Sequence, residues 1–300
     1  EQSHIPARVL GYGEVSTVFA IQAAGLEELA FKRMPIFSTQ EEVEKYRTTF
    51  VEYNRLLEEE IGLRLPEHSQ VDFPNRSGRP IFYIIQQQLP AASIGSKALH
   101  LLSDDAVLVL VRQVLRELRK VWDFNRRQDK VQVAIDGQIS NWALAQTFQV
   151  SETLSGQALE GLRLLYLDTS TPLFRVHGVE QLDTELFLRS APSFLVWTLR
   201  LLFLKDVVDR YYDFHKVAVD LAANFYKEQK ADLIPGVIGV INDFFAGEAA
   251  DLAVSPLTEK EVRYYYQEDA LIWSLYLSMR KVDRFLRKRL LRQEYPYFLP

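Results

Sequence analysis

The chain contains no cysteine, which excludes disulfide-stapled scaffolds, zinc sites built on thiolates and cysteine nucleophiles. Neither sign of charge dominates, because 35 Lys and Arg stand against 40 Asp and Glu, for a net charge of −5. That balance argues against a general nucleic-acid-binding protein. Histidine is scarce, and the five residues show no spacing typical of a metal site: His4, His68, His100, His177 and His215.

Long apolar runs are also missing. The most apolar stretch, Phe194–Leu204, is interrupted by Arg200 and is about half as long as the roughly 20 residues that a membrane span needs. We therefore expect a buried helix there and no transmembrane segment. No charged region followed by an apolar region opens the chain, so we expect no signal peptide and a cytoplasmic location. The chain begins with Glu1, which leaves open whether a preceding segment has been removed.

A chain of 300 residues that is 48% hydrophobic can form two domains or one domain with two lobes. Its first part predicts strands, because short β-branched and aromatic runs alternate with glycines. A helix is expected over residues 39–61, where apolar residues recur at helical spacing behind a Ser-Thr cap. The strands are expected at residues 5–10, 17–21, 29–34 and 81–85.

After residue 90 the pattern becomes helical. A long amphipathic helix is expected over residues 104–127, two short strands at residues 142–145 and 164–167, and helices after residue 180. The sequence thus predicts an α+β fold with a small sheet lobe, residues 1–89, and a larger helical lobe, residues 90–300.

Two glycines, Gly11 and Gly13, lie in the segment Leu10–Val18 between the first two expected strands. Glycines allow the backbone to approach a phosphate closely, although the same pattern is typical of a plain hairpin turn. A dinucleotide-binding fingerprint requires the glycines to open a helix, and here a strand follows, so that interpretation is excluded.

Four polar residues follow in an order that predicts phosphate and metal chemistry. Lys32 lies in the third strand, where its ammonium can reach phosphates under the glycine turn, although a lysine in such a strand is often simply a surface residue at the strand end. Asp136 and Asn141 share one tight loop after the long helix, so the carboxylate can take a hydroxyl proton and the amide oxygen can bind a hard cation. Asp168 follows an apolar strand and is either a strand-end cap or a magnesium ligand. A polar turn is the alternative for the Asp136 loop.

This order of motifs resembles the protein-kinase-like superfamily, and more its aminoglycoside and choline kinase-like branch than ordinary protein kinases. The resemblance covers residues 5–175 by motif. It implies ATP and Mg²⁺ as cofactors. It further implies that Gly11 and Gly13 cover the nucleotide phosphates, that Val18 packs on the adenine, and that Lys32 holds the α- and β-phosphates.

The same resemblance implies an acid on the helix over 39–61 as the partner of Lys32. Glu52 is favoured, because Glu52 and Leu56 repeat the family's E-x-x-x-L spacing, and Glu58 is the alternative. Gln87, Gln88 and Leu89 would form a hinge whose backbone reads the adenine. Asp136 would be the catalytic base, and Asn141 and Asp168 the magnesium ligands.

The chain also departs from the family pattern. Val133, Ala134 and Ile135 precede Asp136, where the family usually has His-Arg or His-Gly, and Thr169 follows Asp168 instead of Phe-Gly or Trp-Glu. Between Asn141 and Asp168 lie 26 residues, about twice the family interval, and residues 151–161 fit a lengthened hairpin. No A-P-E element follows, which argues against a peptide-docking segment.

One further segment is chemically distinctive. Arg280–Arg292 carries seven Lys or Arg and one acid, Asp283, together with apolar residues at helical spacing that include Val282 and Phe285. It is suited to an acidic partner or an anionic surface, although a solvated terminal helix with its apolar face packed on the lobe is the simpler expectation.

Three functions follow from the sequence as hypotheses. The first is an ATP- and magnesium-dependent phosphotransferase whose acceptor is a hydroxyl, with a small molecule favoured. The second is a pseudokinase, which would keep the fold and hold a nucleotide or a protein partner without efficient transfer. The third is transfer of another part of the nucleotide by the same residues.

Overall fold

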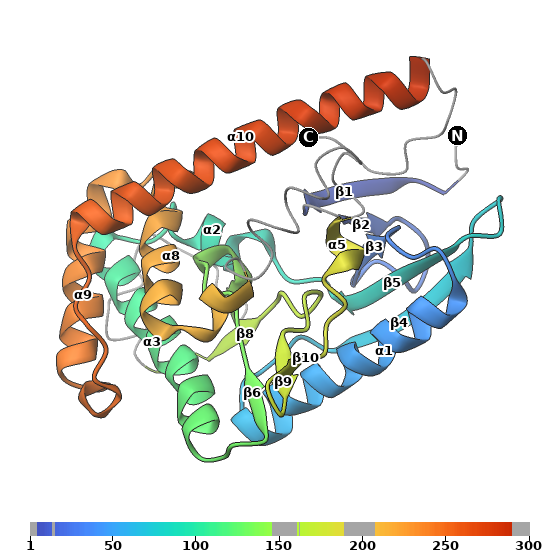
Figure 1. Cartoon of the computed structure of the whole chain (residues 1–300). Coiled ribbons are helices and arrows are strands. Elements are labelled where there is room, and N and C mark those ends of the chain that lie inside the picture. The colour runs from blue at the N-terminus through green and yellow to red at the C-terminus, as the bar shows by residue number, and fades with distance from the viewer. Residues whose placement is uncertain (1–4, 14–15, 146–160, 162, 189–207, 290–300) are drawn as a thin grey trace.

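The computed structural model describes residues 5–13, 16–145, 161, 163–188 and 208–289. Its N-terminal part is a five-stranded antiparallel sheet in the order β1-β2-β3-β5-β4, with helix α1 between β3 and β4 (Figure 1). The bounds are β1 Ala7–Tyr12, β2 Thr17–Ile21, β3 Leu29–Met34, α1 Gln40–Arg55, β4 His68–Pro74 and β5 Pro80–Gln87.

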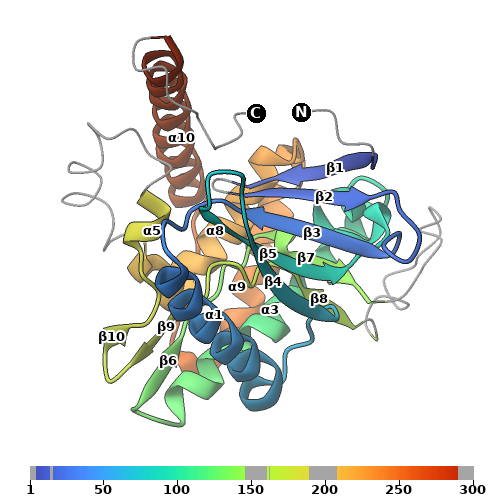
Figure 2. The same ribbon diagram turned by 90° about the vertical axis from the view of Figure 1, so that its right-hand side faces the viewer.

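The register of the sheet decides which side chains face the helical lobe. Val18, Lys32 and Ile84 lie directly opposite one another on β2, β3 and β5, and therefore share one face. Phe19 and Phe31 are also opposite each other but on the other face, where their rings stack 5.8 Å apart. Figure 2 shows these strands side by side, with α1 lying next to them.

Helix α1 begins at Thr39, whose side chain accepts a hydrogen bond from the backbone N–H of Glu42. It continues through a π-helical turn, Leu56–Ile61, and ends at Gly62 with a left-handed φ of 80°, which glycine adopts without strain. The predicted helix over 39–61 is thus confirmed. Its buried stripe consists of Val43, Tyr46, Phe50 and Tyr53.

The C-terminal part is mainly helical and carries two small antiparallel sheets, ordered β10-β9-β6 and β7-β8. This two-lobed α+β arrangement is the one that the kinase-like resemblance predicts, so the fold class is confirmed. The bounds are α2 Gly95–Ala98, α3 Asp104–Arg126, β6 Val131–Val133, β7 Trp142–Leu144, β8 Leu164–Tyr166, β9 Phe174–Val176, β10 Val179–Glu180, α5 Glu185–Leu188, α8 Phe214–Lys227, α9 Ile234–Ala246 and α10 Glu259–Arg289.

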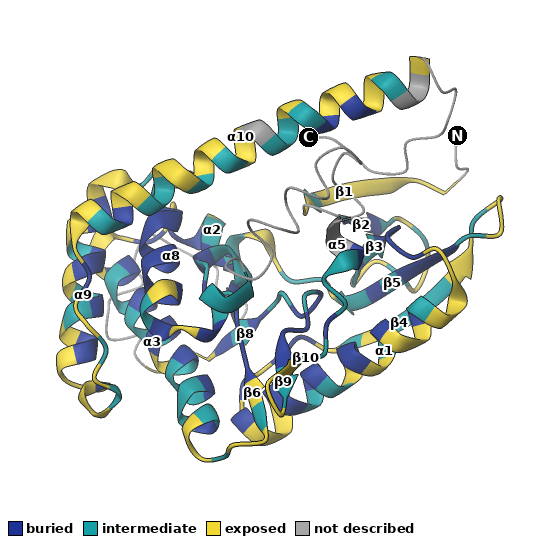
Figure 3. Cartoon of the chain, in the orientation of Figure 1, coloured by how far each residue is buried: buried dark blue, intermediate teal, exposed yellow. Residues whose placement is uncertain are grey.

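Helix α8 is the central element of the helical lobe. Figure 3 shows it mostly buried, whereas α10, which packs along it, is largely exposed. Two apolar cores join the lobes. One lies between the sheet and α1, around Tyr46, Phe50 and Phe82, and the other fills the helical lobe and includes Tyr53 and Leu57 from α1. Because α1 contributes to both cores, it fixes the sheet relative to the helices.

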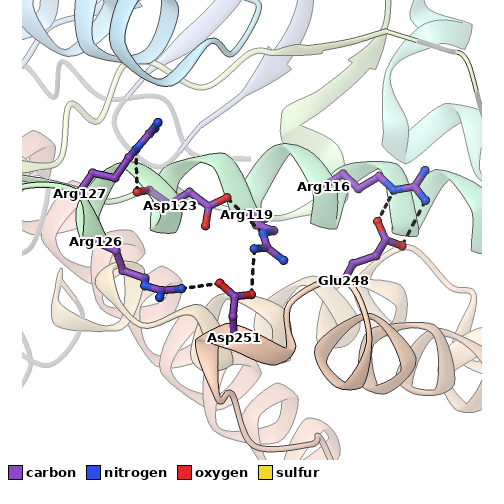
Figure 4. A network of polar contacts seen from close by, with 7 residues as sticks. All are labelled: Arg116, Arg119, Asp123, Arg126, Arg127, Glu248 and Asp251. Carbon is purple, nitrogen blue, oxygen red and sulfur yellow. Dashed lines mark hydrogen bonds and ion pairs between the residues drawn. The ribbon is translucent and has the colours of Figure 1, made fainter.

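A network of exposed ion pairs ties α3 to the segment between α9 and α10 (Figure 4). Glu248 accepts hydrogen bonds from Arg116 at 2.6 and 3.2 Å, and Asp251 is held by Arg119 and Arg126 at 2.9 and 2.6 Å. Each such ion pair contributes little to stability alone. Several arginines that converge on two carboxylates nevertheless hold the segment between α9 and α10 against α3.

Strand β4 was not expected from the sequence. It is an edge strand that pairs only with β5, its residues are mostly half-exposed, and it ends at Pro74, so it lacks a clear apolar alternation. The three-residue strands β6 and β9 are too short to show a period, and they form because they pair with each other. β1 runs from 7 to 12 where residues 5–10 were expected.

The expected apolar helix at Phe194–Leu204 lies outside the described residues, as does most of the expected long hairpin over residues 151–161. The two strands that flank that hairpin are present and pair antiparallel as β7 and β8. Among the helices described, none combines the length and apolar character required to cross a bilayer.

Candidate active site

Lys32 and Asp168 form an ion pair across the two lobes. The ammonium on β3 lies 2.9 Å from Oδ1 of Asp168, which follows β8, and the two side chains are 20% and 25% exposed. The sequence places these residues 136 positions apart. The structure therefore brings together the predicted phosphate ligand and one predicted metal ligand at the junction of sheet and helices.

The carboxylate of Asp168 is held in its ionised form. Burial alone would raise its pKa, but the charge of Lys32 and a hydrogen bond from the Ser170 hydroxyl, 2.7 Å from Oδ1, outweigh burial and lower the pKa. The backbone carbonyl of Ser170 in turn accepts a hydrogen bond from the Tyr46 hydroxyl at 2.8 Å. Helix α1 thereby positions the segment that carries Asp168.

Asn141 lies beside Asp168 because β7 and β8 pair antiparallel. The Leu167 N–H donates to the carbonyl of Asn141 at 2.8 Å, and the Leu167 carbonyl accepts from the side chain of Gln86 at 3.2 Å. Gln86 belongs to β5, so both lobes meet at this point. The Asn141 amide N–H donates to the carbonyl of Asp136 at 3.4 Å, which leaves its side-chain oxygen as the group able to bind a cation.

Asp136 is half-buried in the loop between β6 and β7. Its Oδ1 accepts a hydrogen bond from the backbone N–H of Gln138 at 3.0 Å. Burial, followed by repulsion from Asp220 and Asp168, raises the pKa of Asp136 to about 8. Its surroundings therefore favour the protonated form of the carboxyl and mark it as a candidate for proton transfer.

Helix α8 clamps the loop through a contact that sequence analysis missed. The Gln138 side chain donates to Oδ2 of Asp220 at 3.0 Å and accepts from Asn224 at 3.5 Å. Asp220 and Asn224 are 3% and 2% exposed, and burial raises the pKa of Asp220. A signal was present in the sequence, because Asp220 and Asn224 stand four residues apart in the otherwise apolar run Val217–Phe225 of α8.

Two glycines let the helices pack directly against the Asp136 loop. A Cβ on Gly95 at the start of α2 would lie 2.1 Å from the carbonyl oxygen of Ile139, and one on Gly137 would lie 2.6 Å from Val217. Real Cβ atoms do not approach so closely, so any side chain at Gly95 requires the backbone of the loop to move. The loop is thus fixed by α2 on one side and α8 on the other.

The expected pairing of Glu52 with Lys32 is wrong. Glu52 forms an ion pair with Arg55 at 2.9 Å, three residues further along α1, and Glu58 is exposed on the π-helical turn. The cause is helical phase, because the side of α1 that faces the lobes carries the buried stripe of aromatic residues and Glu52 lies off that stripe.

The hinge differs from expectation in its backbone. The N–H of Gln87 donates to the carbonyl of Glu67 and the N–H of Gln88 to that of Glu28, at 2.8 and 2.7 Å, so neither is available to a base. Leu89, which follows them, stays a predicted hinge residue. The side-chain Oε1 of Gln88 is buried and has no hydrogen-bond partner among the described residues. Gln88 also lines a cavity of about 350 Å³ together with Arg8, Ala20 and Glu27.

The glycine turn is a β-hairpin connection between β1 and β2. Gly11 pairs with Val18, and the N–H of Gly13 donates to the carbonyl of Ser16 at 3.0 Å. A Cβ added to Gly11 would meet nothing within 4 Å. The packing of the protein therefore does not itself require glycine at position 11.

The residues suited to Mg²⁺ are the carboxylate of Asp168 and the amide oxygen of Asn141. No group of three or more His, Asp or Glu with metal-site geometry occurs in the part of the chain that is described. Mg²⁺ in nucleotide sites is usually held by one or two protein oxygens together with phosphates and water. The oxygens of Asp168 and Asn141, which lie near the ammonium of Lys32, fit that pattern, because it does not require a closed cage of protein ligands.

The five-stranded sheet, α1 and the helical lobe that meet at Lys32 and Asp168 define an α+β protein of kinase-like architecture. The chain belongs to a family of unknown function, DUF6206, whose model matches residues 4–284.

No curated protein matches the chain. Among solved structures, it is similar to that titled "WaaP in complex with acyl carrier protein", with 14% sequence identity over 78% of this chain and 89% of the other. The TM-score is 0.33. A superposition this loose carries no argument about function.

Proposed function

We propose that the protein is an ATP- and Mg²⁺-dependent phosphotransferase that acts on a hydroxyl acceptor, with a small molecule favoured. The observation that carries the proposal is the convergence at the lobe junction of Lys32, Asp136, Asn141 and Asp168, which come from three separate segments: β3, the loop between β6 and β7, and the end of β8. A base, a cation and two oxygen donors for a metal are the groups that phosphoryl transfer requires.

Each residue has a role in this proposal. Lys32 would bind the phosphates, and Val18 would contact the adenine, since it shares the lobe-facing side of the sheet with Lys32. Asp168 and Asn141 would hold Mg²⁺, which neutralises phosphate charge. Asp136 would orient the acceptor hydroxyl and take its proton, which requires the ionised form. Gly11 and Gly13 would cover the phosphates.

In this proposal, Lys32 and Asp168 would exchange their ion pair for contacts with the nucleotide and the metal. A nucleotide with Mg²⁺ offers each of them a partner of opposite charge, so the two arrangements compete. Nucleotide binding is consequently expected to depend on magnesium, because without the metal the phosphates would face the Asp168 carboxylate uncompensated.

A pseudokinase is the second candidate, and one observation favours it. No acid of α1 pairs with Lys32 in the described structure, and Glu52 is held instead by Arg55. The residues before Asp136, Val133–Ile135, are buried apolar side chains that add no donor to the site. Such a protein would bind nucleotide, or a protein partner, without efficient transfer.

The first experiment measures thermal unfolding with ATP, with and without Mg²⁺, for the wild type, Asp168→Asn and Asp129→Asn. Asp129 is an exposed acid that precedes β6, outside the Asp136 loop, and serves as the matched control. A nucleotide at about 100 times its dissociation constant adds ~2.7 kcal/mol to the free energy of unfolding, which raises the melting temperature by several degrees. We expect a magnesium-dependent rise that Asp168→Asn abolishes and Asp129→Asn retains.

The second experiment separates the candidates. Incubation with ATP and Mg²⁺, followed by mass spectrometry of the products, should show slow release of ADP that Asp136→Ala abolishes. Binding without turnover would establish the pseudokinase, and a product that retains the nucleoside monophosphate on the acceptor would establish transfer of another part of the nucleotide. No thermal shift with any nucleotide would contradict the phosphotransferase and would favour a pseudokinase that holds a protein partner.

A further inference from the structure

Helix α10 extends beyond both lobes. Figures 1 and 2 show its C-terminal end rising past all the other elements drawn in colour. One side of this end is buried, since Arg280 and Asp283 are 1% and 6% exposed. The other side is exposed to solvent, and its residues differ from those on the exposed side of an ordinary solvated helix.

The exposed side carries a stripe of apolar residues. Leu271, Val282 and Phe285 are separated by eleven and three positions, so they lie on one face of the helix. We call them the α10 stripe. Leu271, Val282 and Phe285 are 70%, 51% and 59% exposed. The expectation that Val282 and Phe285 pack on the lobe is therefore wrong.

Basic residues flank the α10 stripe. Lys281, Arg284 and Arg289 are exposed, and the segment Arg280–Arg292 has a net charge of +6. Because the whole chain carries −5, the remaining residues carry −11. The segment is therefore net positive in a chain that is otherwise net acidic, and three of its basic side chains are exposed on the same helix as the α10 stripe.

We propose that the α10 stripe binds the surface of a lipid bilayer that contains anionic lipids. The apolar side chains would enter the boundary between headgroups and acyl chains, and Lys281, Arg284 and Arg289 would contact the lipid phosphates. A basic helix with an exposed apolar stripe is typical of interfacial helices. A nucleic acid would use the charge but not Val282 or Phe285. The acidic remainder of the protein, repelled by the same surface, would orient the helix toward the membrane.

This inference does not depend on nucleotide binding, and its test needs no nucleotide. Full-length protein is mixed with vesicles of phosphatidylcholine alone or of phosphatidylcholine with phosphatidylserine, and the bound fraction is measured by sedimentation. We expect binding only to vesicles with phosphatidylserine, and a decline as salt is raised. The double variant Val282→Ser/Phe285→Ser should lower the partition coefficient by about tenfold, because two apolar side chains are lost from the interface.

Matched variants separate the α10 stripe from general surface effects. Phe73 and Val179 are 57% and 64% exposed elsewhere on the molecule, so Phe73→Ser/Val179→Ser should leave the partition coefficient unchanged. For the charge, Lys281→Ala/Arg284→Ala/Arg289→Ala should lower it about tenfold or more. The triple variant Lys130→Ala/Lys216→Ala/Lys260→Ala removes the same charge at exposed positions and should have a clearly smaller effect.

Three results would overturn the proposal. One is equal binding to both kinds of vesicle, and another is no binding to either. The third is a wild-type protein that does not bind vesicles but forms a concentration-dependent dimer in analytical ultracentrifugation, where Val282→Ser/Phe285→Ser abolishes the dimer. That last result would assign the α10 stripe to a second copy of the chain.

Discussion

The two halves of the candidate site are built differently. On the helical side, the loop with Asp136 is wedged between α2 and α8, with Gly95 against the backbone of Ile139 and Gln138 held by buried polar groups. On the sheet side, β1 is exposed along almost its whole length, and Gly11 has open space around it. The helical half is a closely packed floor, whereas the glycine hairpin, which we propose as a cover, starts from a strand that is mostly exposed.

This difference matches the demands of the proposed chemistry. Proton transfer and metal binding require side chains held within a narrow geometry, which close packing on rigid elements provides. A cover over a nucleotide must instead admit and release its ligand, which favours few buried contacts. Lys32 stands between the two halves, since it belongs to the sheet but pairs with Asp168 on the floor.

The strongest test of the comparison uses the same substitution on each half. We expect Gly95→Ala to lower the free energy of unfolding by about 2–4 kcal/mol, because the new Cβ forces the Ile139 backbone to move. Gly11→Ala should change it by less than ~1 kcal/mol. Urea denaturation measures both. Equal losses would show that the two halves are equally constrained.

A second test concerns the polar clamp of the floor. Gln138→Leu should lower the free energy of unfolding by about 2–3 kcal/mol, because it leaves Asp220 buried without the hydrogen bond at 3.0 Å. The double variant Gln138→Leu/Asp220→Leu should recover part of that loss, since no uncompensated buried acid remains. A double-mutant cycle in urea measures the coupling, and additive losses would contradict the clamp.

A third test uses pH. The pKa of Asp136 is raised to about 8, so between pH 4 and 8 the folded protein holds a proton that the unfolded chain has released. This group therefore makes the folded state less stable as the pH rises through that range. Asp136→Asn removes this pH dependence of stability. The melting temperature of the variant, relative to that of the wild type, should therefore rise by a few degrees between pH 5 and pH 9.

Asp129→Asn is the control for that titration and should track the wild type at every pH. Any transfer activity should show the opposite trend, with the rate rising as the pH approaches 8, because the base acts when ionised. A melting-temperature difference that stays constant with pH would show that Asp136 is not protonated in the folded protein.

The smallest effect is expected away from both halves, in the ion-pair network of α3. Glu248→Gln should lower the free energy of unfolding by about 0.5 kcal/mol, because exposed pairs are largely solvated, and high salt should remove the difference. Asp251→Asn should act in the same direction. Thermal melts at low and high salt check this, and a loss as large as that of Gly95→Ala would place a stability hot spot outside the site.

Local sequence pattern accounts for much of the fold. The helices over 39–61 and 104–127 and the strands that carry Lys32 and precede Asp168 followed from periodicity, caps and glycines, because these signals act within a few residues. The edge strand β4 and the short β6 and β9 did not, because they depend on pairing with distant strands.

The sequence by itself determined which chemical groups this protein has and in what order, and its local patterns predicted the α+β fold with a sheet part followed by a helical part. Only the tertiary structure decided their partners. Lys32 pairs with Asp168, 136 residues away, and not with Glu52, and Gln138 is held by Asp220, 82 residues away. Propensity and periodicity are local properties of the chain, whereas an ion pair or a buried hydrogen bond is set by helical phase and by the packing of remote elements.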